Sequence, residues 1–127
     1  MAGQIYDGFV PGRFPIDAYG KGGFRFADMS HRGSLQALPS GLKAWDVSEP
    51  SQLNEAAFSD VLAEAADIEL LLIGTGVNLV PLREPLLWHL RAAGIRIDVM
   101  QTGAAARTFN ILLAEKRRVA AALIAVD

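Results

Sequence analysis

The fold of this chain is decided by the stretch from Ile68 to Asn110, which reads IELLLIGTGVNLVPLREPLLWHLRAAGIRIDVMQTGAAARTFN. It contains two apolar runs, Ile68–Ile73 and Ile95–Met100, and each leads into a glycine turn and then into a helical pattern. Strands that alternate with helices at a repeat of about 30 residues predict βαβ units with parallel strands. Because both runs are rich in apolar side chains, we expect both strands to be covered on both faces.

The two glycine turns, Gly74-Thr75-Gly76 and Thr102-Gly103, directly follow the predicted strands. Right-handed crossovers bring the ends of parallel strands to the same edge of a sheet. Open α/β sheets commonly bind their ligands at this edge. We therefore expect the two turns to lie side by side, and we name this region the glycine-turn edge.

Composition narrows the classes of protein to consider. The chain has 127 residues, of which 51% are hydrophobic and 20% are charged, so we expect a single domain over residues 1–127. With a net charge of −2 and no basic stripe, nucleic-acid binding is not expected. The absence of cysteine excludes disulfides and thiolate metal sites, and two histidines offer little further metal chemistry. Without a long apolar run or an apolar leader, we expect a cytoplasmic chain that has no transmembrane segment. We also expect no cofactor.

The N-terminal part, residues 1–47, predicts antiparallel β hairpins separated by glycine and proline turns. In Phe24-Arg25-Phe26, a period of two sends both rings to one side and Arg25 to the other, so this sheet should have a buried face and a wetter face. The pair Ser30-His31 is expected in a turn. The predicted strands are Ile5–Val10, Ile16–Tyr19, Gly23–Ala27, Ser34–Leu38 and Leu42–Val47.

Three helices are predicted, over about Glu55–Ala66, Leu82–Ala93 and Ala104–Lys116. Asn54 can cap the first helix, and Gly94 can end the second. A final strand is expected over Val119–Val126. The fold class is therefore α/β, with N-terminal antiparallel hairpins and a C-terminal βαβαβ unit in a mixed, layered sheet. The first helix should pack through Phe58, Val61, Leu62 and Ala65.

Catalytic patterns are weak. A dinucleotide fingerprint would need a third glycine where the chain has Leu79, so Gly74-Thr75-Gly76 is better explained as a tight turn that needs glycine dihedral angles. Ser30 and His31 have no third residue to orient the imidazole. His89 is expected at the boundary of its helix and not as a metal ligand. We therefore expect no catalytic and no metal-binding residues.

The segment from Thr102 to Asn110 is a candidate anion site. A helix that starts at Thr102 or Gly103 has free backbone N–H groups there, and Arg107 adds a guanidinium one turn later. The competing interpretation is structural. In that case Thr102 only caps the helix, Arg107 pairs with a carboxylate such as Asp98 or Glu115, and Asn110 fixes a loop.

Two large apolar side chains, Trp88 and Ile111, are predicted on the outward faces of their helices. Trp88 lies roughly opposite the apolar stripe of its own helix. We expect a second layer of the same domain, formed by the β hairpins, to cover the indole. The alternative is that Trp88 is an anchor for another chain, because tryptophan is enriched in protein interfaces. The stripe consists of Leu82, Leu86, Leu90 and Ala93.

Five segments resemble the Mth938-like domains, a family of unknown function that includes a mitochondrial complex I assembly factor. They are Ile73-Gly74-Thr75-Gly76, Gly94-Ile95 through Val99-Met100, Thr102 through Leu112, Gly20 through Arg25 and Trp45-Asp46. The resemblance implies a compact α/β domain with a mixed sheet and layered helices. It also implies a role beside membrane machinery, and no catalytic residues are established for the family.

Two functions are therefore considered. The first is a non-catalytic interaction or assembly-factor-like protein, which binds a protein partner through Trp88 and Ile111 and assists the biogenesis of a respiratory or other membrane complex. A second copy of the chain is also considered as a partner. The alternative is a small-ligand or anion-binding domain, conceivably an enzyme, that uses the glycine-turn edge. Its candidate residues are Gly74, Thr75, Gly76, Thr102, Gly103, Arg107 and Asn110.

Overall fold

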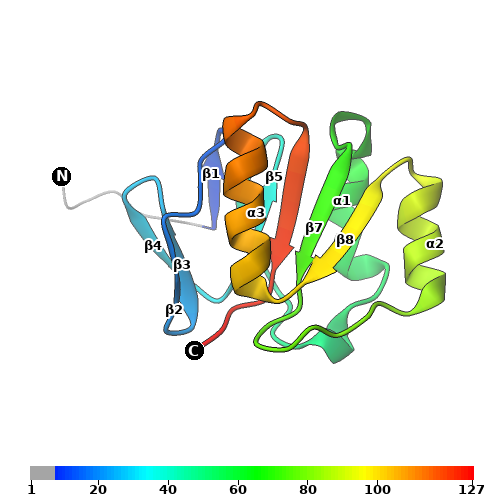
Figure 1. Cartoon of the computed structure of the whole chain (residues 1–127), viewed down its shortest axis with the longest axis horizontal. Coiled ribbons are helices and arrows are strands. Elements are labelled where there is room, and N and C mark those ends of the chain that lie inside the picture. The colour runs from blue at the N-terminus through cyan, green and yellow to red at the C-terminus, as the bar shows by residue number, and fades with distance from the viewer. Residues whose placement is uncertain (1–7) are drawn as a thin grey trace.

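The structure of the chain is a computed structural model that describes residues 8–127. Two sheets are present in this range, one of six strands and one of three (Figure 1). The large sheet has the order β1 (Phe9–Pro11), β6 (Gly41–Trp45), β5 (Ser34–Leu38), β9 (Val119–Leu123), β7 (Leu70–Gly74) and β8 (Arg96–Met100). The small sheet has the order β2 (Ala18–Gly20), β3 (Gly23–Phe26) and β4 (Met29–Arg32).

The large sheet is mixed, as the sequence predicts. β7 pairs in parallel with both β8 and β9, which confirms the βαβαβ unit. β5 pairs antiparallel with β9 and with β6, and β6 pairs antiparallel with β1. β9, the last strand of the chain, therefore joins the parallel and antiparallel parts.

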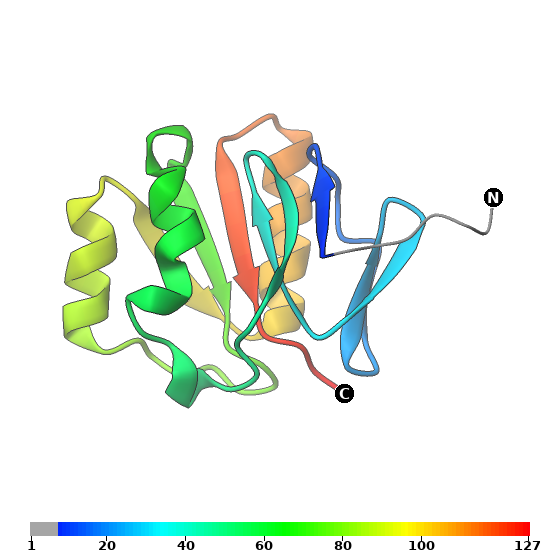
Figure 2. The ribbon, with the colours of Figure 1, turned by 180° about the vertical axis from the view of Figure 1, so that it is seen from behind.

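The helices form layers on both faces of the large sheet. α3 (Thr102–Ala114) lies on one face with the small sheet beside it, whereas α1 (Ser59–Ala63) and α2 (Glu84–Ala92) lie on the other face (Figures 1 and 2). Side chains alternate along β7, so that Leu71 and Ile73 join the core under α1 and α2. Leu72 joins the core under α3 and the small sheet, where Phe24 and Phe26 are also buried. The predicted buried face of this sheet is thereby confirmed, and Arg25 is exposed.

The expectation that both strands are covered on both faces holds for β7 and is wrong for β8. Arg96 and Asp98 in β8 are exposed, and Ile97 and Val99 are only half-buried. β8 is an edge strand, and α3 packs mainly on β7 and β9. Charged residues on an edge strand also oppose pairing with further strands.

The first predicted helix, Glu55–Ala66, is broken into three short pieces. Two 3₁₀ turns, Ala56–Phe58 and Ala65–Asp67, flank α1. The Trp45 Nε1–H donates to the Ala57 carbonyl at 2.8 Å, and this carbonyl would otherwise accept from the N–H four residues later in an α-helix. Asn54 caps the segment as predicted, because its Oδ1 accepts from the Ala57 N–H at 2.9 Å.

Ser30 and His31 lie in strand β4, so their predicted place in a turn is wrong. Ala27 and Asp28 have positive φ values of 49° and 62°, and they form a tight reversal that returns the chain beside β3. The His31 Nε2–H donates to the Ser34 carbonyl at 2.8 Å. Of the predicted strand Ile5–Val10, residues 5–7 lie outside the described residues, and Phe9 and Val10 form the start of β1.

Candidate binding sites

The two glycine turns lie together, as the crossover rule predicts. The Gly76 N–H donates to Thr102 Oγ1 at 2.9 Å, and the Thr102 N–H donates to the Gly76 carbonyl at 2.9 Å. The Thr102 hydroxyl in turn donates to the Ile124 carbonyl at 2.7 Å. Thr102 is completely buried. Its hydroxyl therefore joins both turns to the chain directly after β9.

Backbone geometry explains the glycines of the first turn. Gly76 has a φ of 103°, a conformation that favours glycine. A Cβ atom on Gly74 would lie 2.8 Å from Thr102 Cα, so glycine permits the close approach of β7 to α3. The buried Thr75 hydroxyl donates to the Asn78 carbonyl at 2.7 Å and accepts from the Val80 N–H at 3.0 Å. Thr75 thus organises the loop that follows β7.

The start of α3 contacts the small sheet. A Cβ atom on Gly103 would overlap the Tyr19 hydroxyl, so the phenol of β2 lies directly against this glycine. The exposed Arg107 donates from Nη1 to the same hydroxyl at 3.4 Å. Within residues 8–127, Arg107 has no carboxylate within 4.0 Å, neither Asp98 nor any other. Ligand binding at the glycine-turn edge stays a prediction, with Arg107 as its exposed cation.

Asn110 connects α3 to the segment before β2. Its Oδ1 accepts from the Ile16 N–H at 2.7 Å, and its Nδ2 donates to the Ile16 carbonyl at 2.7 Å. A paired amide of this kind satisfies both backbone groups of an extended residue, which a strand neighbour would otherwise do. These contacts support the structural interpretation of Asn110.

Trp88 and Ile111 are both exposed, at 66% and 60%. The expectation that another layer of the domain covers Trp88 is therefore wrong. The small sheet packs beside α3, on the opposite face of the large sheet from α2 (Figures 1 and 2). Ala93 is also exposed and not part of the buried stripe, because α2 ends at Ala92. Among residues 8–127, no layer covers the Trp88 side chain, and about two thirds of it is exposed on α2.

Metal ligation and strong charge coupling are sparse. No group of three or more His, Asp or Glu side chains that could hold a metal is found in the described part of the chain. His89 lies 3.7 Å from Glu55, and both are exposed. Glu69 forms an ion pair with Arg117. The hydrogen bond from Arg117 at 2.9 Å lowers the pKa of the Glu69 carboxyl, and the hydrogen bond from the Arg118 N–H adds to this effect. Glu69 therefore links the approach to β7 with the approach to β9.

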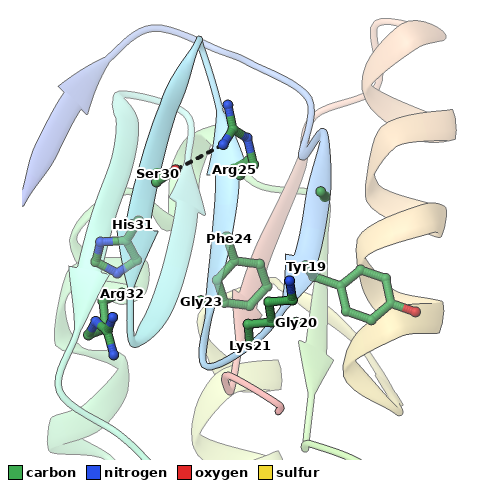
Figure 3. A pocket seen from close by; sticks show the side chains of 10 residues that line it. Tyr19, Gly20, Lys21, Gly23, Phe24, Arg25, Ser30, His31 and Arg32 are labelled. Atoms are coloured by element: carbon green, nitrogen blue, oxygen red, sulfur yellow. Dashed lines mark hydrogen bonds between the residues drawn. The ribbon is translucent and has the colours of Figure 1, made fainter. Parts of the chain in front are cut away.

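The structure shows one hollow that the sequence analysis does not predict. A cavity of about 590 Å³ lies on the small sheet (Figure 3), and its charged lining residues are Lys21, Arg25 and Arg32. We call it the basic hollow. The alternation of side chains along β3 predicts that Arg25 faces outward. The same position for Arg32 follows only once residues 29–32 are known to form a strand. Ala18, Tyr19, Gly20, Gly23, Phe24, Ser30 and His31 complete the lining.

Comparisons with known proteins place this geometry among related chains. Residues 16–124 match the family described as a protein of unknown function (DUF498/DUF598). An uncharacterized protein of Rhodobacter capsulatus is 38% identical over 116 residues, which cover 89% of this chain and 86% of that protein. The NADH dehydrogenase (ubiquinone) 1 alpha subcomplex assembly factor 3 of Danio rerio is 34% identical over 109 residues, which cover 86% of this chain and 63% of that protein. The chain therefore matches less than two thirds of the assembly factor.

Solved structures share the fold over nearly the whole chain. A crystal structure described as an outer membrane protein from Bartonella henselae has a TM-score of 0.89 at 57% identity, covering 92% of this chain and 98% of that one. A Bordetella pertussis protein described as a Mth938-like domain has a TM-score of 0.78 at 28% identity, covering 88% and 85%. In residues 8–127 of this chain, no helix has the length and hydropathy needed to cross a membrane.

Proposed function

The chain belongs to the Mth938-like family of unknown function, as its sequence resemblance implies, and from this premise we propose that it is a non-catalytic, assembly-factor-like protein. In this proposal it acts in the cytoplasm, binds a protein partner and assists the biogenesis of a respiratory or other membrane complex. The observation that carries the proposal is the 34% identity to a complex I assembly factor over 86% of this chain.

The extent of the match supports a shared binding role. The family match over residues 16–124 begins before β2 and ends after β9. It therefore includes the three α-helices, the small sheet and every strand of the large sheet except β1. The chain spans 63% of the Danio rerio assembly factor and 59% of the human one. The remaining parts of those proteins lie outside the comparison, so their specific partners are not transferred to this chain.

The exposed apolar side chains supply the surface. Trp88 on α2 and Ile111 on α3 are largely exposed, and large aromatic side chains contribute strongly to protein interfaces. Both side chains project from regular helices, so the backbone that carries them needs no further ordering on binding. We expect at least one of them to contact the partner.

Cross-linking in a native host tests the proposal. A photoreactive amino acid replaces Trp88 in one version of the chain and Ile111 in another, and the cross-linked proteins are identified by mass spectrometry. We expect a subunit or assembly intermediate of a membrane complex. Trp88→Ala or Ile111→Ala should reduce capture of this protein by the affinity-tagged chain.

Phe9→Ala provides a matched control, because Phe9 is an exposed aromatic at the opposite edge of the large sheet from β8. Its capture of the partner should equal that of the wild type. If a deletion strain assembles all its membrane complexes normally, and no membrane-complex protein cross-links at either position, the proposed function is wrong.

A further inference from the structure

We propose that the basic hollow on the small sheet binds an acidic, extended peptide segment of a protein partner. This inference rests on the proposed function, since it names the chemistry of the partner that an assembly-factor-like protein would hold. It concerns a surface distinct from Trp88 and Ile111.

Strand pairing places the cations of the hollow on one face. Arg25 lies opposite Ser30, and Gly23 lies opposite Arg32, in the antiparallel pair of β3 and β4. Directly paired residues point to the same side of a sheet. Phe24 and His31, which pair with each other, are both buried. Because side chains alternate along a strand, Arg25, Ser30 and Arg32 point to the opposite, outward side.

Glycine backbone forms part of the floor of the hollow. Gly23 carries no side chain, and a Cβ atom there would overlap the His31 carbonyl, so this position requires glycine. Gly20 of β2 lies opposite Gly23. A Cβ atom at Gly20 would have no neighbour within 4 Å among residues 8–127, so the space above this glycine is open. The two glycines leave a shallow depression between the longer side chains of Arg25 and Arg32, with Lys21 in the adjacent turn (Figure 3).

Direct ion pairs do not neutralise the charge of the hollow. Within residues 8–127, no carboxylate lies within 4.0 Å of Lys21, Arg25 or Arg32. The polar contact of Arg25 is a hydrogen bond of 3.3 Å from its Nη1 to the Ser30 hydroxyl. Among residues 8–127, no Asp or Glu lines the cavity, although the chain has 14 acidic residues and a net charge of −2. Grouped cations without carboxylate partners favour a ligand with several negative charges.

The spacing of the cations fits an extended chain better than a single anion. Figure 3 shows Arg25 and Arg32 at opposite ends of the hollow, with their guanidinium groups pointing apart. Their backbone positions form a diagonal of the β3 and β4 pair, about 7–8 Å apart, and the guanidinium groups diverge from there. A single small anion cannot bridge charges that diverge in this way. An extended peptide spans about 6.6–6.8 Å for every two residues, so carboxylates two or more residues apart can face the two arginines in turn.

The aromatic residues argue against single-stranded nucleic acid as the ligand. Such ligands stack their bases on exposed aromatic rings beside a basic groove. Here Phe24 is buried, and Tyr19, although 42% exposed, points toward Gly103 on α3 and away from Arg25 and Arg32 (Figure 3). A peptide needs no such platform.

Fluorescence anisotropy of a labelled peptide tests the inference. The probe contains four Glu-Thr repeats, and a peptide with Gln in place of Glu is the neutral control. We expect the acidic probe to bind, its affinity to fall with added salt, and the neutral peptide not to bind. The double variant Arg25→Glu/Arg32→Glu should weaken binding by about tenfold or more.

Arg83→Glu/Arg91→Glu is the matched control, because it makes the same change of charge at two exposed positions in and beside α2, at the far end of the molecule (Figure 1). Its affinity for the acidic probe should fall less than twofold. Equal losses in both double variants would show general charge attraction and overturn the inference. Circular dichroism of each variant establishes that the fold is retained.

Three further outcomes overturn the proposal. One is the absence of peptide binding by the wild-type chain. The others are binding of oligothymidylate, or of phosphatidylserine vesicles, that depends on Arg25 and Arg32 while the peptide does not bind. If the peptide fails but cross-linking at Trp88 or Ile111 still captures a membrane-complex protein, only this inference is wrong. If cross-linking also fails and a deletion strain assembles all its membrane complexes normally, the proposed function is wrong as well.

Discussion

Thr102→Val removes the hydroxyl that joins the two glycine turns to the end of β9 while it preserves the shape of the side chain. Thr102 Oγ1 accepts from the Gly76 N–H at 2.9 Å and donates to the Ile124 carbonyl at 2.7 Å. All three residues are buried, so water does not replace the lost partners. The variant therefore leaves one donor and one acceptor unpaired.

The expected cost follows from these two bonds. A buried hydrogen bond contributes about 0.5–1.5 kcal/mol, and each polar group left without a partner in the interior costs about 1–3 kcal/mol. Some relaxation of the turns offsets part of this cost. We expect the free energy of unfolding to fall by about 2–4 kcal/mol, whereas a residue that only caps an exposed helix end would cost about 1 kcal/mol.

Urea denaturation followed by circular dichroism measures this change, provided that the m-value is unchanged. Thr102→Ser keeps the hydroxyl and should lose less than half as much stability. Thr108→Val is a control on the same helix, because the Thr108 hydroxyl reaches only the Met100 sulfur at 3.7 Å. If Thr102→Val costs no more than Thr108→Val, the hydroxyl does not hold the turns together and the reasoning fails.

Three other variants test the exposed features. Trp88→Ala should change the free energy of unfolding by less than about 0.5 kcal/mol because the ring is 66% exposed, and a loss near 3 kcal/mol in urea denaturation would place it in a core. Arg107→Ala should cost less than about 1 kcal/mol, and if the glycine-turn edge binds anions, the variant should lose any thermal shift that phosphate produces in the wild type. Glu69→Gln should remove a pH-dependent contribution. Because Arg117 lowers the pKa of Glu69 in the folded state, its carboxylate stabilises the fold above the ordinary carboxyl pKa, and this contribution disappears as the pH falls through the lowered value. Unfolding curves of wild type and Glu69→Gln should therefore differ at neutral pH and converge in acid, and a constant difference would exclude this linkage.

Several features were accessible from sequence because they depend on near neighbours. Gly94 ends α2 with a φ of 87°, as its position after the helical pattern predicts. Phe24 and Phe26 share the buried side of β3 because side chains alternate along any strand. The parallel pairing of β7 with β8 follows from the length and handedness of the crossover.

Part of the glycine-turn edge could also be anticipated. The crossover rule brings Gly76 and Thr102 together, and the hydrogen bonds between them confirm that placement. The contact of Tyr19 with Gly103 and the bridge from Asn110 to Ile16 could not be found in this way. Asn110 and Ile16 are 94 positions apart, and no periodic pattern in either segment specifies the other. Only the docking of the small sheet beside α3 brings these partners together.

The sequence by itself determined the order of strands and helices in the C-terminal half, the mixed class of the sheet and the meeting of the two turns, because local periodicity and crossover handedness are sufficient for these. Tertiary structure alone decided which surface each outward side chain meets. The small sheet packs against the α3 face, so Trp88 on α2 is left exposed. Likewise, the Trp45 indole N–H donates a hydrogen bond to the Ala57 carbonyl, and the segment with helical periodicity is interrupted there. A hydrogen bond or packing layer supplied from a distant part of the chain can outweigh local preference, because a single α-helical turn is only marginally stable alone.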